Sequence, residues 1–198
     1  MTREFQVGVL LAGGASSRMK GRPKALLRDE SGRTFIERLV EALRRGGCRA
    51  VIVVGGRHVA EIAQELPEDA LLVRNPRWES GQLSSAQAGL RAALAIAASR
   101  VVLHLVDQPL IRPADVAKVL GSLGGADLAI AAHRGEPGHP IALSAQTAER
   151  VARSRASNLR VALEQAAPQT VIVEGCSAGC VRGANTPAEL RALLGRRK

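Results

Sequence analysis

The chain has 198 residues, of which 46% are hydrophobic and 23% charged, so bulk disorder is excluded and one domain over residues 1–198 is expected. The net charge of +10 predicts an anionic partner, but aromatic residues make up only 2%, which disfavours nucleic acid and leaves a phosphorylated small molecule. No apolar run reaches membrane-spanning length and the N-terminal run is too short for a signal peptide, so we expect a soluble, cytoplasmic protein with no membrane partner.

Short apolar runs alternate with segments of helical periodicity along the chain. The runs predict buried strands at residues 7–11, 50–54, 71–73, 101–106 and 128–132, and the periodic segments predict helices at 34–45, 59–66, 82–98 and 113–123. After residue 133 we expect a loop at 134–140, short strands at 141–143 and 171–173, and a last helix from Pro187. This alternation predicts an α/β fold: a single three-layer domain with a mostly parallel central sheet.

A glycine-rich segment follows the first predicted strand, where open α/β folds bind ligands. Gly13 and Gly14 let backbone N–H groups approach an anion, and Ser16 and Ser17 add hydroxyl donors. Arg18 and Lys24 place two cations on the same segment, which suits a triphosphate. The segment matches neither the Walker A pattern nor G-x-G-x-x-G. The alternative is an ordinary glycine-rich turn with surface cations.

The segment from Leu11 and Ala12 to Lys24, read as LAGG-x-SSRM followed by PKALL, resembles the signature of the MobA/MocA-like molybdenum cofactor nucleotidyltransferases. Lys20 departs from it, since many members have glycine there. The resemblance implies a Rossmann-like domain of the GT-A type, a nucleoside triphosphate donor, Mg²⁺, and nucleotidyl transfer with release of pyrophosphate. It also implies contact with molybdoenzyme maturation proteins.

A second group of polar residues follows the third predicted strand, in the segment from Asn75 to Ser85. Gly81 precedes a helix whose first turn holds Ser84, so free N–H groups and a hydroxyl are available there. The resemblance extends to this segment and implies that Asn75, Gly81 and Ser84 contact the base and ribose of the donor. Trp78 is expected to be a local packing anchor instead.

Asp107 ends the strand predicted at residues 101–106, where a carboxylate is costly unless a cation pairs with it. Oxygen ligands that also bridge to phosphate favour Mg²⁺, and the resemblance makes Asp107 the principal metal ligand. The alternative is a structural cap for the helix near Pro113. His104, inside the same strand, is expected to be a hydrogen-bonded core histidine.

The segment from Gly183 to Pro187 combines a helix start with a second candidate metal ligand. Thr186 and Pro187 suit an N-cap and a first helical position. The resemblance implies a polar residue facing the metal, and Asn185 supplies a neutral oxygen there. Gly183 stands at the other polar position of the family element and offers no ligand.

Gly138, His139 and Pro140 resemble the G-H-P segment that lines the acceptor side in the MocA-like branch. His139 either orients an acceptor phosphate or is an exposed loop histidine. Cys48, Cys176 and Cys180 are expected to be reduced thiols, because the Cys176–Cys180 spacing has no further Cys or His pair to complete a zinc site.

These parts support in-line attack of an acceptor phosphate on the α-phosphate of the donor. In this reaction Arg18 and Lys24 stabilise charge on the phosphates. LAGG is typical of guanylyl transfer, whereas NPxWxxG and G-H-P are typical of cytidylyl transfer. We favour CTP, then GTP, with a molybdopterin-type acceptor. A sugar phosphate or other phospho-acceptor, and a nucleotide-binding module without catalysis, remain alternatives.

Overall fold

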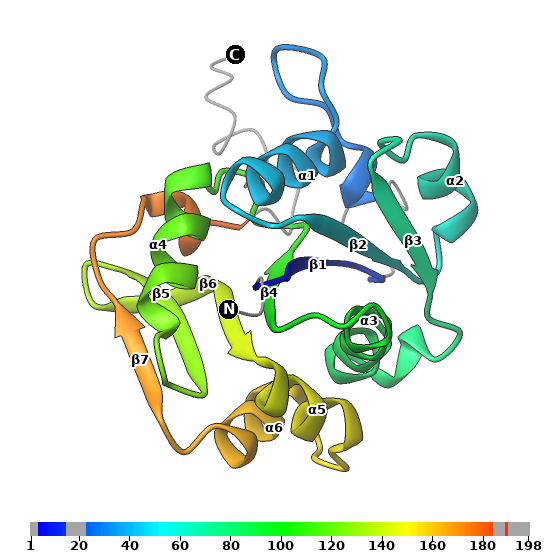
Figure 1. The fold of residues 1–198 in the computed structure, drawn as a ribbon. Helices are drawn as coiled ribbons and strands as arrows, with labels where there is room; N and C mark the ends of the chain where they lie inside the picture. The colour runs from blue at the N-terminus through cyan, green and yellow to red at the C-terminus, as the bar shows by residue number, and fades with distance from the viewer. Residues whose placement is uncertain (1–3, 15–22, 184–188, 190–198) are drawn as a thin grey trace.

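A seven-stranded sheet organises the computed structural model of the chain, which describes residues 4–14, 23–183 and 189 (Figure 1). The strand order is β3-β2-β1-β4-β6-β5-β7. The strands are β1 (Gln6–Ala12), β2 (Ala50–Gly55), β3 (Ala70–Arg74), β4 (Arg100–Leu105), β5 (Leu128–His133), β6 (Glu136–Ser144) and β7 (Thr170–Val173). Only β6 runs antiparallel to its neighbours β4 and β5, so the predicted mostly parallel α/β sheet is confirmed.

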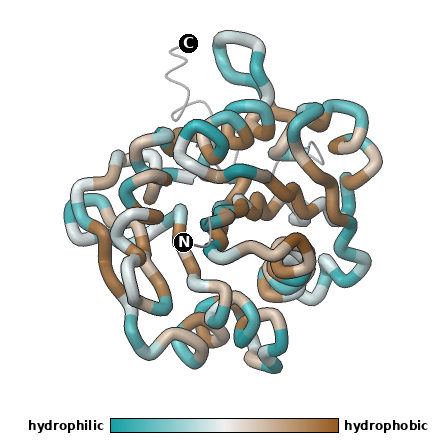
Figure 2. The backbone as a smooth tube through the Cα atoms, in the orientation of Figure 1, coloured by the Kyte–Doolittle hydropathy of each residue, from teal (hydrophilic) through white to brown (hydrophobic). Residues whose placement is uncertain are grey.

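Helices cover both faces of the sheet and make three layers (Figure 1). They are α1 (Phe35–Arg45), α2 (Val59–Gln64), α3 (Gln82–Ala95), α4 (Pro113–Leu123), α5 (Ala145–Arg153) and α6 (Leu159–Ala166), with short 3-10 turns η2 (Lys24–Leu26), η3 (Trp78–Ser80) and η4 (Ala178–Cys180). One core cluster lies under α1 and α4, and the other lies under α3, α5 and α6. Figure 2 shows hydrophobic residues gathered along the strands and hydrophilic residues in peripheral loops.

Strand β1 shows why a continuous apolar run predicts a strand buried on both faces. Val7, Val9 and Leu11 belong to the cluster under α3, whereas Leu10 and Ala12 belong to the cluster under α1. Side chains alternate across a strand, so a run without polar interruptions needs a hydrophobic layer on each side. Within the described part of the chain, no helix has both the length and the apolar character needed to span a membrane.

The region after residue 133 differs from the prediction of a loop at residues 134–140. Arg134 and Gly135 both have positive φ and form a two-residue turn, and β6 already begins at Glu136. The positive φ values match the type I′ geometry that joins twisted antiparallel strands. Pro137 and Pro140 argued against a strand in this segment. The pairing of β5 with β6 is irregular between Ile130 and Ala132, however, and a strand tolerates proline near such an irregularity.

Candidate active site

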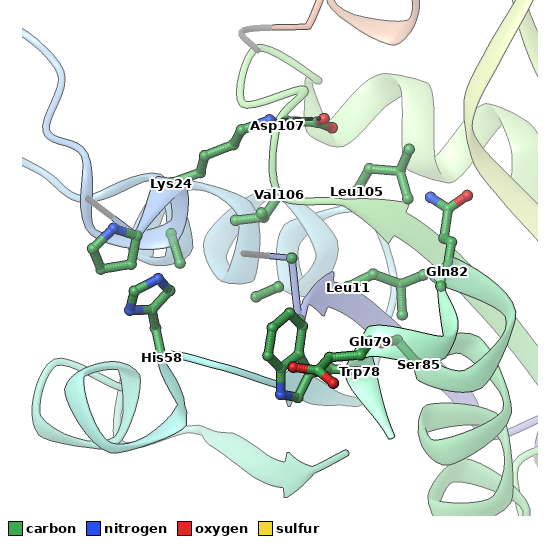
Figure 3. Close-up of a pocket in the computed structure, with 16 residues that line it drawn as sticks. Leu11, Lys24, His58, Trp78, Glu79, Gln82, Ser85, Leu105, Val106 and Asp107 are labelled. Carbon is green, nitrogen blue, oxygen red and sulfur yellow. Dashed lines mark hydrogen bonds and ion pairs between the residues drawn. The ribbon is translucent and has the colours of Figure 1, made fainter. Parts of the chain in front are cut away.

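A cavity of about 380 Å³ opens at the carboxyl ends of β1 and β4 (Figure 3). Its lining residues are Leu11, Ala12, Gly13, Gly14, Pro23, Lys24, Ala25, His58, Trp78, Glu79, Gly81, Gln82, Ser85, Leu105, Val106 and Asp107. The chain leaves β1 for β2 on one side and later returns to β4 on the other, so the strand order reverses here. Open α/β sheets bind ligands at this reversal, and the volume suits a small molecule.

The loop after β1 forms one wall of the cavity through its backbone. A Cβ added to Gly56 would lie 2.3 Å from the Gly13 carbonyl oxygen, so the chain after β2 packs directly against this loop. A Cβ at Gly13 would lie 2.8 Å from Ser85 Oγ, whereas one at Gly14 would meet no atom of the described residues within 4 Å. Gly13 is therefore required by packing inside the protein, and Gly14 leaves space on the cavity side.

Lys24 and Asp107 meet at the cavity although they lie on segments far apart in the sequence. Lys24 Nζ lies 3.4 Å from Asp107 Oδ2, and the two side chains are 16% and 26% exposed. Figure 3 shows both side chains together near the end of β4. The carboxylate therefore has the cationic partner that its position at a strand end requires. A long contact of this kind leaves carboxylate oxygen available to a ligand.

The turn that carries Asp107 is held by hydrogen bonds on both sides of it. Val106 N donates to Leu11 O at 3.1 Å and ties the turn to β1. His104 Nε2 lies 2.9 Å from Gln108 O and donates to it. Burial, then the neighbouring His139, lowers the pKa of His104 to about 3, so the ring is neutral and Nε2 carries its proton. His104 is fully buried as expected, and its Nδ1 has no partner among the described residues.

His139 lies in β6 beside the end of β4, so the expectation of an exposed loop histidine is wrong. Its ring packs edge-on against His104 with ring centroids 6.3 Å apart. Burial lowers the pKa of His139 to about 4, although the negative charge of Asp107 acts to raise it. The ring is therefore neutral near pH 7. His139 therefore offers a hydrogen bond rather than a positive charge. Its neighbour Gly138 has no room for a Cβ, which would lie 2.1 Å from Cys180 O, and Pro140 is buried.

The segment from the end of β3 to the first turn of α3 contains two kinds of residue: some hold the loop by hydrogen bonds, and others line the cavity. Asn75 is buried and its Nδ2 donates to Ser84 Oγ at 2.9 Å and to Ser85 Oγ at 3.0 Å. Ser84 Oγ in turn lies 2.8 Å from the carbonyl oxygens of Arg77 and Gly81, to which it donates. Asn75 and Ser84 thus brace the loop and are not among the described lining residues, whereas Gly81 is.

Several lining residues were not singled out from the sequence. Ser85 lines the cavity in place of Ser84, and His58, Glu79 and Gln82 complete the same wall (Figure 3). His58 follows β2, so the rule that ligands bind after strand ends was sufficient to find it. Trp78 also lines the cavity, although we expected a packing anchor, and its Cβ blocks the space that a Cβ on Gly56 would need.

Other predicted site residues lie outside the described residues: Ser16, Ser17, Arg18 and Asn185. Among the described lining residues, Asp107 and Glu79 carry the carboxylates. A hard divalent cation prefers such oxygen ligands, and Asp107 at the base of the cavity fits it. The paired lysine supplies a second positive charge beside the same position.

Comparison with known proteins places this geometry in a family. The model of the "MobA-like NTP transferase domain" matches residues 8–171. The chain is 35% identical over 146 residues to nicotine blue oxidoreductase from Paenarthrobacter nicotinovorans, covering 70% of each protein. It is 30% identical over 134 residues to the bifunctional protein GlmU from Pelotomaculum thermopropionicum, covering 67% of this chain but only 28% of GlmU.

Solved structures agree with the family match. Rv0371c from Mycobacterium tuberculosis H37Rv is 25% identical with a TM-score of 0.76, covering 99% of this chain and 100% of that one. Molybdopterin-guanine dinucleotide biosynthesis protein A from Archaeoglobus fulgidus shares the fold, with a TM-score of 0.71 at 20% identity and coverage of 96% and 97%. The chain belongs to the MobA-like NTP transferase family.

Proposed function

We propose that this protein transfers a nucleotidyl group from a nucleoside triphosphate to a phosphorylated acceptor of the molybdopterin type, with CTP favoured as donor and GTP next. The observation that carries the proposal is the Lys24–Asp107 pair, 3.4 Å apart, beside the glycine loop at the reversal of strand order. A cation and a carboxylate at a cavity of about 380 Å³ suit a nucleotide donor that arrives with a divalent metal.

The reaction needs positioning and charge stabilisation more than acid or base catalysis. An oxygen of the acceptor phosphate attacks the α-phosphorus, the bond to the bridging oxygen of the β-phosphate breaks, and pyrophosphate leaves with the electron pair. The backbone N–H groups at Gly13 and Gly14 bind phosphate oxygens, and Lys24 stabilises negative charge that grows in the transition state. Arg18, Ser16 and Ser17 are proposed to act on the same phosphates.

Asp107 and Asn185 are proposed to hold Mg²⁺, which when bound neutralises phosphate charge. The hydrogen bonds of Val106 and His104 support this role, because they hold the turn that carries Asp107. The divalent metal is also supported by Rv0371c, which has a structure in complex with manganese. On the acceptor side, His139 is proposed to donate a hydrogen bond to the acceptor, since its lowered pKa keeps the ring neutral.

The choice of base is proposed to depend on the wall formed by Glu79, Gln82 and Gly81. Glu79 carries an acceptor-only carboxylate at the cavity. The amino group of cytosine or guanine is a donor for it, and uracil has no such group. This chemistry supports CTP and GTP over UTP. A cytoplasmic location, a single domain over residues 1–198 and contact with molybdoenzyme maturation proteins are further parts of the proposal.

The test is a pyrophosphate-release assay with CTP, GTP, ATP and UTP, each with Mg²⁺ and with or without molybdenum cofactor. Release with CTP or GTP that requires the acceptor supports the proposal. Release that instead requires a sugar phosphate supports the alternative acceptor. Binding of nucleotide without release under any condition would identify a non-catalytic module.

A second candidate function is an oxidoreductase, because a relative 35% identical over 70% of both chains carries the name nicotine blue oxidoreductase. The chain holds no G-x-G-x-x-G fingerprint for a dinucleotide, and the loop after β1 instead reads Gly13-Gly14 followed by serines. The two candidates separate in one experiment: reduction of nicotine blue with NADH or NADPH, followed by absorbance, beside the pyrophosphate assay.

A further inference from the structure

Two cysteines and an aspartate form a cluster outside the cavity. Cys176 follows β7, Cys180 ends η4, and Asp115 lies in the first turn of α4. Their two sulfur atoms and a carboxylate oxygen all lie within 4.8 Å of one another, and all three residues are buried. The sequence spacing showed only the cysteine pair, because Asp115 comes from a segment 61 residues upstream of Cys176.

Hydrogen bonds to Asp115 hold the cysteine turn in place. Ser177 donates to the carboxylate twice, from its backbone N at 2.8 Å and from its Oγ at 2.6 Å, and Arg112 N donates at 2.9 Å. Gly179 also packs against the chain before α4, where a Cβ would lie 2.1 Å from Leu110 O. The carboxylate and the two thiols are therefore oriented by the fold itself, as the outer contacts of metal sites orient their ligands.

The cluster gathers donors that suit a cation. Burial opposes ionisation of Asp115, yet the hydrogen bonds from Ser177 and Arg112 lower its pKa below the ordinary value, so the carboxylate is charged. No described lysine or arginine forms an ion pair with it. A C-x3-C pair lies within the spacing found in zinc sites, and an aspartate oxygen is an accepted third ligand.

We propose that Cys176, Cys180 and Asp115 bind a thiophilic divalent cation of the Zn²⁺ class, with a water molecule as the fourth ligand. Binding displaces the two thiol protons to solvent, and the two thiolates with the carboxylate leave the complex with one net negative charge. Burial raises the pKa of the Cys176 thiol above its ordinary value, so the bound cation must compensate for that cost; the Lys118 ammonium, which donates to Glu174 O at 2.5 Å, acts in the opposite direction and favours the thiolate. This site is separate from the metal proposed at Asp107.

A cation bound at this site would hold together the segments that form the proposed acceptor side. Cys180 O packs against Gly138, next to His139, and Gly179 packs against Leu110, three residues after Asp107. A bound cation ties both of these contacts to the start of α4. It therefore stabilises the wall on which the proposed acceptor would lie, without touching the nucleotide cavity.

Titration of the metal-free full chain with Co²⁺, in the absence of air and with a phosphine reductant, tests the site. The expected result is near-ultraviolet thiolate-to-cobalt absorption that saturates at stoichiometric Co²⁺ and is displaced by Zn²⁺. Cys176→Ser and Cys180→Ser should abolish it, and Ser177→Ala should weaken the affinity by about 10–100-fold. Cys48→Ser is the matched control, since Cys48 is also buried and lies outside the cluster.

Circular dichroism of each variant separates loss of the site from loss of the fold, and thermal unfolding gives a second readout. At a free Zn²⁺ concentration 100 times Kd, the midpoint of wild type and Cys48→Ser should rise by roughly 5–10 °C over the chelator-treated protein. Absence of the absorption in folded wild type overturns the proposal. So does absorption that persists in Cys176→Ser, or reduced protein whose unfolding midpoint does not respond to Zn²⁺.

Discussion

The two halves of the sheet contribute to the proposed site in different ways. The parallel half, β3-β2-β1-β4, lines the cavity with backbone and side chains from stretches that follow its strands, such as Gly13 after β1 and His58 after β2. The mixed half, β6-β5-β7, supplies none of the described lining residues and instead packs against other elements: His139 of β6 contacts His104 of β4, and the cysteine turn after β7 contacts Asp115 of α4. The donor side is therefore built from local segments, and the acceptor side from distant ones.

Lys24 lies beside Asp107 at the cavity, so its removal should have the largest effect. Lys24→Ala should lower the rate of pyrophosphate release by about 10²–10³-fold while weakening nucleotide binding far less, because its contact with the phosphates strengthens in the transition state. Arg28→Ala is the control, since Arg28 pairs with Glu65 on the surface outside the cavity. Near-wild-type turnover of Lys24→Ala would remove Lys24 from the reaction.

Asp107→Asn tests the metal at the end of β4, the last strand of the parallel half. With Mg²⁺ and nucleotide at 100 times Kd, wild type should gain about 2.7 kcal/mol of stability, and the variant should lose most of that gain. The measurement is thermal unfolding with Mg²⁺ alone, nucleotide alone and both together. A variant that keeps the full response to both ligands would make Asp107 a structural residue.

Gly56→Ala probes the donor side without changing any polar group. A Cβ at this position would lie 2.3 Å from the Gly13 carbonyl oxygen and 2.6 Å from Trp78 Cβ, so the backbone of the glycine loop must shift. We expect a loss of about 1–3 kcal/mol in the free energy of unfolding and weaker nucleotide binding. A Cβ at Gly14 would meet no atom of the described residues within 4 Å, so Gly14→Ala should fold with wild-type stability. Equal unfolding energies for the two variants would contradict the close packing.

Substitution of His104 should have the smallest effect, and it tests the buried contact between β4 and the mixed half, where His104 packs against His139. Its pKa of about 3 lies below the unfolded value near 6.5, so the unfolded chain binds more protons between these values and stability falls as pH falls. The loss should reach about 1.4 kcal/mol per pH unit below pH 6.5. His104→Gln keeps an N–H donor near Gln108 O but does not titrate, so denaturant unfolding at pH 7 and pH 5.5 should show a shallower decline. An unchanged slope would mean that the His104 ring does not determine this pH dependence.

Much of the donor side was predictable because its signals are local. Each apolar run predicted a strand within one or two residues of its observed bounds, from β1 to β5, since side chains buried on both faces leave no polar interruption. Gly13, Gly14 and Asp107 lie one or two residues beyond the ends of β1 and β4, Gly81 lies in the connection from β3 to α3, and all four line the cavity. The resemblance to the nucleotidyltransferase family rests mainly on one contiguous stretch, Leu11–Lys24, and the match to the family model confirms the family.

Only the tertiary structure decided the rest, because the contacts concerned join residues far apart in the chain. The sequence predicted only residues 141–143 of β6 as a strand and missed its first five residues, because the glycine and prolines there are typical of a loop and the irregular pairing with β5 is a tertiary feature. The sequence motif predicted that Asn75 and Ser84 contact the donor. In the folded protein, Asn75 Nδ2 donates to Ser84 Oγ, and Ser84 Oγ donates to the loop backbone. The Lys24–Asp107 pair and the cluster of Asp115 with the cysteines likewise depend on sheet order, which local propensity does not encode.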